Sequence, residues 1–258
     1  LHLSIRRQRQ MCIRDSVSLA PAVSHNLMTS VPRNFFMITL RIWDLPTRLF
    51  HWLLAAGFVG LVITGNIGGN AMVWHFRLGY GVFTLLVFRL LWGFVGGHWS
   101  RWAQLPLHPR HFLAYWREQS GPESLAGHNP MGSWSVLALI GLLSLQVATG
   151  LVSDDEIANA GPLTSMVPGA WVSVATGWHK HWGKLILIVL VLTHLAAIVW
   201  HKLKSHDLIP AMLHGDKVLN EAVRPSRDDL TSRLVALTVV LCCGAGVAWL
   251  VSWGGQLN

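Results

Sequence analysis

The fold is decided by residues 178–201, which have the sequence WHKHWGKLILIVLVLTHLAAIVWH. No charged side chain occurs from Leu185 to Trp200, and His179 and His194 stand fifteen residues apart. In a regular α-helix this spacing places the two imidazoles about 60° apart around the axis and about 22 Å apart along it. One helix can therefore present a histidine near each face of a bilayer. Histidine is rarely buried in a membrane without a partner, so this pair indicates a cofactor, an ion path or a proton relay.

The composition is that of an integral membrane protein. Hydrophobic residues make up 52% of the 258 positions and charged residues only 12%, unlike an ordinary soluble domain. Five apolar segments are each near the length that crosses a hydrocarbon core of about 30 Å as a helix. They cover residues 49–65, 78–97, 134–152, 178–201 and 234–253. The sequence therefore predicts an all-α fold, an integral membrane bundle with a four-helix core and a fifth, C-terminal transmembrane helix.

The basic residues predict the orientation of these helices. Lys and Arg gather before the first segment, between the second and third, and after the fourth. The positive-inside rule assigns these connections to the cytoplasm, so we expect a cytoplasmic N-terminus and a C-terminus on the periplasmic or exterior side. The net charge of +8 then reflects loop asymmetry. Nucleic acid is not an expected partner.

Residues 1–36 differ from the rest of the chain. They include five arginines but show no periodic pattern and no long apolar core. We expect a non-native or disordered leader without function, and an authentic start at Met37. Residues 37–230 are expected to form the four-helix membrane domain, and residues 231–258 the fifth helix and a short tail. The chain has no Cys-x-x-Cys-His motif, which excludes covalent c-type haem attachment.

The histidines of the apolar segments fall into two levels once the helices have directions. His51 near the start of the first helix and His194 in the fourth lie toward the cytoplasm. His75 and His179 lie at the outer starts of the second and fourth helices. We expect an inner pair, His51 with His194, and an outer pair, His75 with His179. Two neutral imidazoles on opposite sides of a flat macrocycle suit axial ligation of haem iron within a helix bundle.

The other histidines are weaker candidates. His181 lies thirteen residues from His194, which turns it about 140° from the His194 face of a regular helix and favours His179. His201 is expected at the cytoplasmic interface. Solvated surface positions are expected for the loop histidines His98, His108, His111, His128, His206 and His214. For the four paired histidines the alternative is a hydrogen bond between helices.

Three basic side chains lie where they suit the carboxylates of a cofactor. Arg89 is the only charged residue between Arg77 and Arg101, and it follows His75 by fourteen residues. It should therefore lie within about 40° of the His75 face and about 21 Å deeper, near the inner pair. Arginine is well suited to pairing with haem propionates. Arg77 and Lys180 are placed to do the same at the outer pair. Snorkelling to the interface is the alternative for each.

Several motifs accompany these histidines. They are WDLPTRLFHW (43–52), His75 with LGY (78–80), VFRLLWG (87–93), GHNP (127–130), SDDE (153–156), and WHK (178–180) with His194. Together they resemble the bacterial cytochrome b561 family, which includes the cytochrome b subunits of nickel-iron hydrogenases, over about residues 42–229. The chain departs from many relatives in having His179-Lys180 and a fifteen-residue spacing, where they have His-Glu and fourteen.

The resemblance implies a di-haem b-type cytochrome of the bacterial inner membrane with ligands at His51, His75, His179 and His194. The implied function is electron transfer between the quinone pool and a periplasmic c-type cytochrome or oxidoreductase subunit, without catalytic residues of its own. The acidic run Asp154, Asp155 and Glu156 suits a basic partner, or is an ordinary solvated loop. One alternative is a haem-bearing membrane anchor of a hydrogenase-like or dehydrogenase complex.

A metal-ion or proton transporter is an alternative of another class, because transporters also place histidines within the membrane. Such a protein would favour carboxylates and broken helices near the midplane. None of the five apolar segments contains Asp or Glu. The sequence therefore favours a cytochrome over a transporter.

Overall fold

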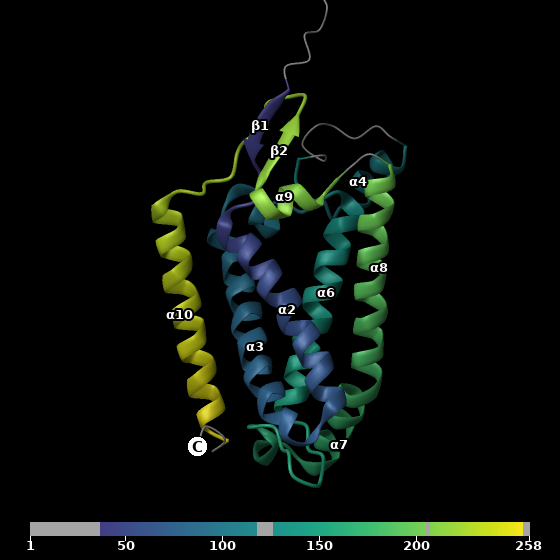
Figure 1. Ribbon diagram of the computed structural model, residues 1–258, viewed down its shortest axis with the longest axis vertical. Coiled ribbons are helices and arrows are strands. Elements are labelled where there is room, and N and C mark those ends of the chain that lie inside the picture. Colours follow the sequence, from purple (N-terminus) through teal and green to yellow (C-terminus); the bar gives the residue numbers. More distant parts are fainter. Residues whose placement is uncertain (1–36, 118–125, 205–206, 255–258) are drawn as a thin grey trace, which may run out of the picture. The chain divides into compact units, whose positions relative to one another are not determined.

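The computed structural model describes residues 37–117, 126–204 and 207–254, so the expected leader, residues 1–36, lies outside the described residues. The described part contains five helices that are long and apolar enough to cross a membrane. They are α2 (Leu45–Ile67), α3 (Met72–Val95), α6 (Pro130–Leu151), α8 (Gly183–Leu203) and α10 (Leu230–Ser252) (Figure 1). The predicted all-α membrane bundle is confirmed.

Polar caps set where three of these helices begin. Asp44, Asn129 and Asp229 precede α2, α6 and α10, and each side chain accepts a hydrogen bond from the backbone N–H three residues later, at 2.6–2.8 Å. Such a bond satisfies one of the amide groups that the first turn of a helix leaves without a partner. These helices therefore begin several residues before the apolar segments, at positions that hydropathy alone does not mark.

Shorter elements lie at the two ends of the bundle (Figure 1). One end, here called the sheet end, carries β1 (Ile38–Arg41), β2 (Asp216–Leu219), α4 (Pro109–Trp116) and α9 (Ile209–His214). The opposite end, here called the α7 end, carries α7 (Gly169–Gly177), which continues through the π-helical turn η5 (Trp178–Trp182) into α8. The described residues also contain four 3-10 turns, η1 (Gly69–Ala71), η2 (His98–Ser100), η3 (Trp102–Gln104) and η4 (Thr164–Met166).

The two-stranded sheet is an addition to the predicted helices. β1 and β2 pair antiparallel, with Ile38 opposite Leu219 and Arg41 opposite Asp216. Each strand has four residues, which is too short for an alternating pattern to be distinguished in the sequence. The sheet connects the segment that precedes α2 to the segment that follows α9, at the sheet end of the bundle.

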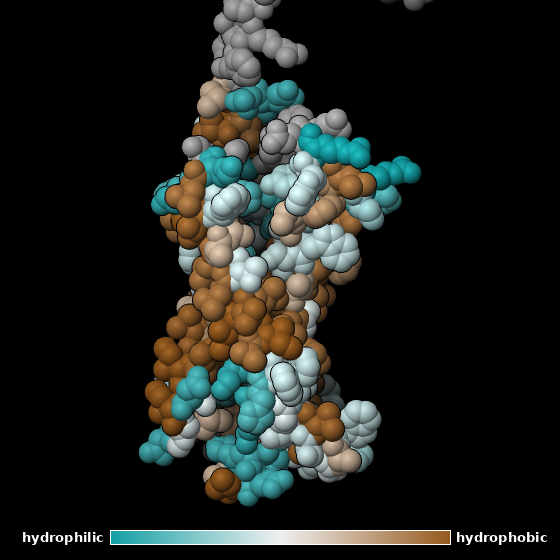
Figure 2. All heavy atoms as spheres, turned by 90° about the vertical axis from the view of Figure 1, so that its right-hand side faces the viewer, coloured by the Kyte–Doolittle hydropathy of each residue, from teal (hydrophilic) through white to brown (hydrophobic). Residues whose placement is uncertain are grey.

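Two apolar clusters hold the helices together. Val82, Leu86, Ile140, Leu143 and Leu187 join α3, α6 and α8. A second cluster joins α2, α3 and α10, and α10 packs mainly on α3, outside the other four helices (Figure 1). Figure 2 shows hydrophobic side chains around the middle of the bundle and hydrophilic ones toward both ends, on the face that includes α8. This distribution suits a bilayer between the two ends.

Asp44 joins three segments at the sheet end. It is fully buried, and its carboxylate accepts hydrogen bonds from Thr47 N at 2.8 Å, Gly97 N at 2.8 Å and Ser100 Oγ at 2.9 Å. Trp92 Nε1 lies 3.3 Å from Oδ2. A Cβ at position 97 would lie 2.4 Å from Oδ2, so only glycine permits this approach. Asp44 thus connects the start of α2 to the end of α3 and the turn that follows it.

We expect Asp44→Ala to destabilise the bundle by several kcal/mol, because each buried donor left without an acceptor costs about 1–3 kcal/mol. Asp229→Ala is the matched control, since it removes an exposed helix cap worth about 1 kcal/mol. Thermal unfolding in detergent measures both. Equal losses of stability in the two variants would contradict the role assigned to Asp44.

Candidate functional site

The four histidines singled out in the sequence lie at two levels of the bundle. His51 is in the second turn of α2, counted from the sheet end, and His194 is in the middle of α8. His75 is in the first turn of α3 and His179 in η5, both at the α7 end. The structure brings His75 and His179 together, with ring centroids 6.1 Å apart and planes at 89°.

Both imidazoles of the α7-end pair are oriented through Nδ1. His75 Nδ1 lies 3.1 Å from the carbonyl oxygen of Leu61 and 3.3 Å from Thr64 Oγ1. His179 Nδ1 lies 2.8 Å from the carbonyl oxygen of Gln146. A carbonyl only accepts, so Nδ1 is the protonated nitrogen in each ring and Nε2 keeps its lone pair for a metal. Hydrogen bonding thus sets the tautomer that metal ligation requires.

The separation of the two rings also suits one shared metal. Metal–imidazole bonds are about 2.0–2.1 Å long, so two rings on opposite sides of one metal have centroids about 6 Å apart. Glycines on neighbouring helices make room for the rings. A Cβ at Gly150 of α6 would lie 2.7 Å from His179 Cε1, and one at Gly65 of α2 would lie 3.0 Å from His75 Cε1. The α7-end site therefore fits a metal-centred group held by two histidines.

The second pair lies closer to the sheet end. His51 and His194 are near enough to interact electrostatically, although they come from α2 and α8, whose backbones make few direct contacts. The His51 ring packs edge-on against Trp52, with centroids 5.0 Å apart. Among the described residues, His51 Nδ1 is buried without a hydrogen-bond partner. Packing therefore holds the His51 ring, whereas hydrogen bonds hold the rings of the α7-end pair.

Arg89 is buried close to the sheet end. Its Nη1 donates to the carbonyl oxygen of Ser100 at 3.0 Å, and its guanidinium lies over the Trp102 ring, 4.2 Å from the centroid. Arg89 is also within electrostatic reach of Asp44. A buried guanidinium needs compensating charge or hydrogen bonds, and these contacts supply part of both.

Arg77 and Lys180 are exposed at the α7 end. The Arg77 guanidinium lies 5.1 Å from the centre of the Trp74 ring. Within the part of the chain that the structure describes, neither side chain forms an ion pair with a carboxylate. His181 is exposed as well, whereas His179 is half-buried against His75.

The expectation that His128 is a solvated surface residue was wrong. Its ring packs edge-on against Trp43, with centroids 4.6 Å apart, and its Nδ1 is buried without a hydrogen-bond partner among the described residues. Burial, and secondarily the charge of Arg89, lower the pKa of His128 to about 3. Local sequence patterns did not indicate this contact, because Trp43 lies eighty-five residues earlier in the chain.

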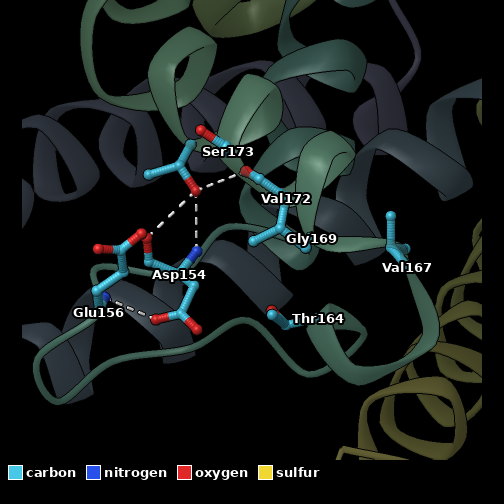
Figure 3. A pocket seen from close by; sticks show the side chains of 8 residues that line it. Asp154, Glu156, Thr164, Val167, Gly169, Val172 and Ser173 are labelled. Atoms are coloured by element: carbon cyan, nitrogen blue, oxygen red, sulfur yellow. Dashed lines mark hydrogen bonds between the residues drawn. The ribbon is translucent and has the colours of Figure 1, made fainter.

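The acidic run lies in the loop before α7. Asp155 accepts hydrogen bonds from the Asn159 side chain at 2.7 Å and from the backbone N–H groups of residues 157–159, which hold the pKa of Asp155 well below its usual value. Asp154 Oδ1 accepts from Glu156 N at 2.7 Å. Figure 3 shows Asp154 and Glu156 lining an open pocket with residues of α7. Two of the three carboxylates thus shape the loop, and Glu156 is exposed.

A family model described as prokaryotic cytochrome b561 matches residues 42–215, more than half of the chain and including all four paired histidines. The chain belongs to the prokaryotic cytochrome b561 family. α10 lies beyond the matched range. Membership of this family implies haem b, and the α7-end histidine pair fits that cofactor because it offers two oriented imidazoles from different helices.

Three relatives are each named as a probable Ni/Fe-hydrogenase B-type cytochrome subunit. The subunit of Azotobacter chroococcum mcd 1 is 28% identical, with 70% of this chain and 89% of the relative covered. That of Cupriavidus necator is 27% identical, with 70% and 87% covered, and that of Bradyrhizobium diazoefficiens is 26% identical, with 69% and 86% covered. No solved structure is significantly similar to this chain.

We expect Gly150→Ala to lower the haem content per chain by up to about half, because the added methyl group would displace the His179 imidazole. Gly141→Ala, on the same helix, is the control, since nothing lies within 4 Å of a Cβ at that position. Haem quantitation on purified protein compares the two. Equal haem content in both variants would contradict the close packing assigned to Gly150.

Proposed function

We propose that this cytochrome carries electrons across the membrane through two haem b groups, with axial ligands His75 and His179 for one and His51 and His194 for the other. The observation that carries the proposal is the α7-end pair, with ring centroids 6.1 Å apart and both Nδ1 atoms at carbonyl oxygens. Haem would supply reversible one-electron chemistry when bound. The protein positions the imidazoles, each of which is half-buried.

Basic side chains near each pair are proposed to bind the propionates. Arg89 lies on the same helix as His75 but close to the sheet end, where it suits the cofactor of His51 and His194. Arg77 and Lys180 lie at the α7 end and suit the other cofactor. Arginine pairs bidentately with carboxylates, which favours Arg89 and Arg77 for this task.

We further propose that the sheet end faces the cytoplasm and that the α7 end and the C-terminus face the periplasm. The connections at the sheet end carry most of the basic residues, which supports this orientation. Quinone or quinol is proposed as one redox partner, and a periplasmic c-type cytochrome or oxidoreductase subunit as the other. The exposed Glu156 at the α7 end suits a basic partner there.

The second candidate function is a haem-bearing membrane anchor for a hydrogenase-like or dehydrogenase complex. It is favoured by the names of the relatives, which are subunits of Ni/Fe-hydrogenases. The two functions differ in whether the haems pass electrons between the faces or chiefly support assembly. A metal-ion transporter has less support, since the described residues contain no cluster of three or more His, Cys, Asp or Glu suited to a metal ion.

Purified protein is expected to contain two b haems per chain and to show a b-type reduced-minus-oxidised spectrum. His75→Ala and His194→Ala should each lose about one haem, because they belong to different pairs. Haem quantitation and redox titration measure this result. Absence of haem, or full haem content in both variants, would contradict the proposal.

His181→Ala is expected to keep both haems, because His181 is exposed and His179 lies against His75. His179→Ala should instead lose about one haem, as His75→Ala does. The same quantitation compares these three variants. Loss of haem from His181→Ala with retention in His179→Ala would assign the outer ligand to His181.

A further inference from the structure

The helix that carries His179 contains one turn that is wider than an α-helical turn. In η5 the N–H of Gly183 donates to the carbonyl oxygen of Trp178, five residues earlier. In a regular α-helix this N–H would instead donate to the carbonyl oxygen of His179, four residues earlier. The π-turn therefore leaves the His179 carbonyl without its usual partner. Such turns are rare in proteins, and those that occur are often found at functional sites.

A side chain from another helix takes the place of the missing donor. Nε2 of Gln146, in α6, donates to the carbonyl oxygen of His179 at 2.8 Å. The backbone carbonyl oxygen of Gln146 accepts from His179 Nδ1, also at 2.8 Å. The two residues are thus joined by a pair of hydrogen bonds, one to the backbone of His179 and one to its ring. Both hydrogen bonds therefore hold His179, whose ring lies against that of His75.

The wide turn changes the direction of His179 relative to His194. A π-turn holds one more residue than an α-turn, so fifteen residues that include it advance about as far as fourteen residues of continuous α-helix. The angle between the two side chains then changes by about 100°, from about 60° on one side to about 40° on the other. The angle of about 60° that the sequence predicts between these two side chains assumes a regular α-helix. The π-turn directs the His179 ring to the space beside Gly150.

We propose that Gln146 is the positioning residue for the outer haem ligand, because it stabilises the π-turn that aims His179 at His75. This inference rests on the proposed function, in which His179 binds haem iron. Without the Gln146 amide, the carbonyl oxygen of His179 would lose its donor from α6, which favours return of η5 to α-helical hydrogen bonding. That return would rotate the imidazole away from His75.

The surroundings of the amide support this role. Gln146 Oε1 and Trp178 Nε1, an acceptor and a donor, are both buried without partners among the described residues. A Cβ at Gly183 would lie 2.0 Å from Gln146 Oε1 and 2.6 Å from Trp178 Nε1, so both atoms lie close to a position that only glycine leaves open. A small rotation would let Trp178 donate to Gln146. This bond would keep the Nε2 side of the amide turned to His179.

The test combines a substitution with a deletion in the full-length protein. Gln146→Leu keeps similar volume but removes the donor to His179, so we expect it to lose about one of two haems, or to shift the low-spin electron paramagnetic resonance signal of one haem alone. Deletion of the exposed His181 removes the extra residue of the π-turn. We expect the deletion alone to keep both haems, since fourteen residues of regular α-helix preserve the direction of His179.

The double variant gives the decisive measurement. In the protein that lacks His181, Gln146→Leu should have no effect on haem content or on the resonance signals, because a regular helix leaves no carbonyl for Gln146 to satisfy. The haem of His51 and His194 reports in every variant whether the bundle has folded. Haem loss that the deletion rescues would be a signature that general misfolding does not produce.

Three results would overturn the inference. An unchanged haem content and an unchanged resonance signal in Gln146→Leu would remove the positioning role but leave the proposed function intact. Haem loss that the deletion of His181 does not rescue would remove the π-turn from the explanation. Absence of haem from the wild-type protein would instead overturn the proposed function, and the inference with it.

Discussion

Polar groups on membrane-spanning helices must find partners within the protein or its cofactor, since lipid offers none. This constraint accounts for several buried hydrogen bonds of the bundle. Asp44 collects buried donors from α2, the end of α3 and the following turn. The Nδ1 atoms of His75 and His179 are matched to carbonyl oxygens. Protonation at Nδ1 leaves the Nε2 atoms of this pair able to bind a metal, which connects the hydrogen bonding of the bundle to its proposed electron transfer.

The helix formed by α7, η5 and α8 is shared by both proposed haem sites. Its two histidines face different partners, His75 of α3 at the α7 end and His51 of α2 nearer the sheet end. α6 packs on α8, whereas α2 packs mainly on α3. Glycines admit the rings of the α7-end pair, and α10 lies outside the four helices. A single helix can thus hold one ligand of each pair while its neighbours supply the others.

Much of this arrangement could be predicted from local patterns. Hydropathy located the five spans, and the direction of each helix placed the histidines at two levels. The helices begin earlier than the apolar segments, because Asp44, Asn129 and Asp229 act as caps. The burial of His128 depends on how the chain enters α6, and the contact of Arg89 with the Trp102 ring depends on a turn after α3. Neither follows from hydropathy or helical periodicity.

The sequence by itself determined the membrane class, the number of spans and the level of each paired histidine along the bundle, because hydropathy and the rise per residue are properties of a single segment. Only the tertiary structure decided the direction in which His179 points. A π-turn leaves a carbonyl oxygen without a partner, and whether such a turn persists depends on a donor from elsewhere in the fold. Gln146 of α6 is that donor, thirty-three residues away in the chain. The spacing of His179 and His194 therefore set their separation, while packing between α6 and η5 set the angle between them.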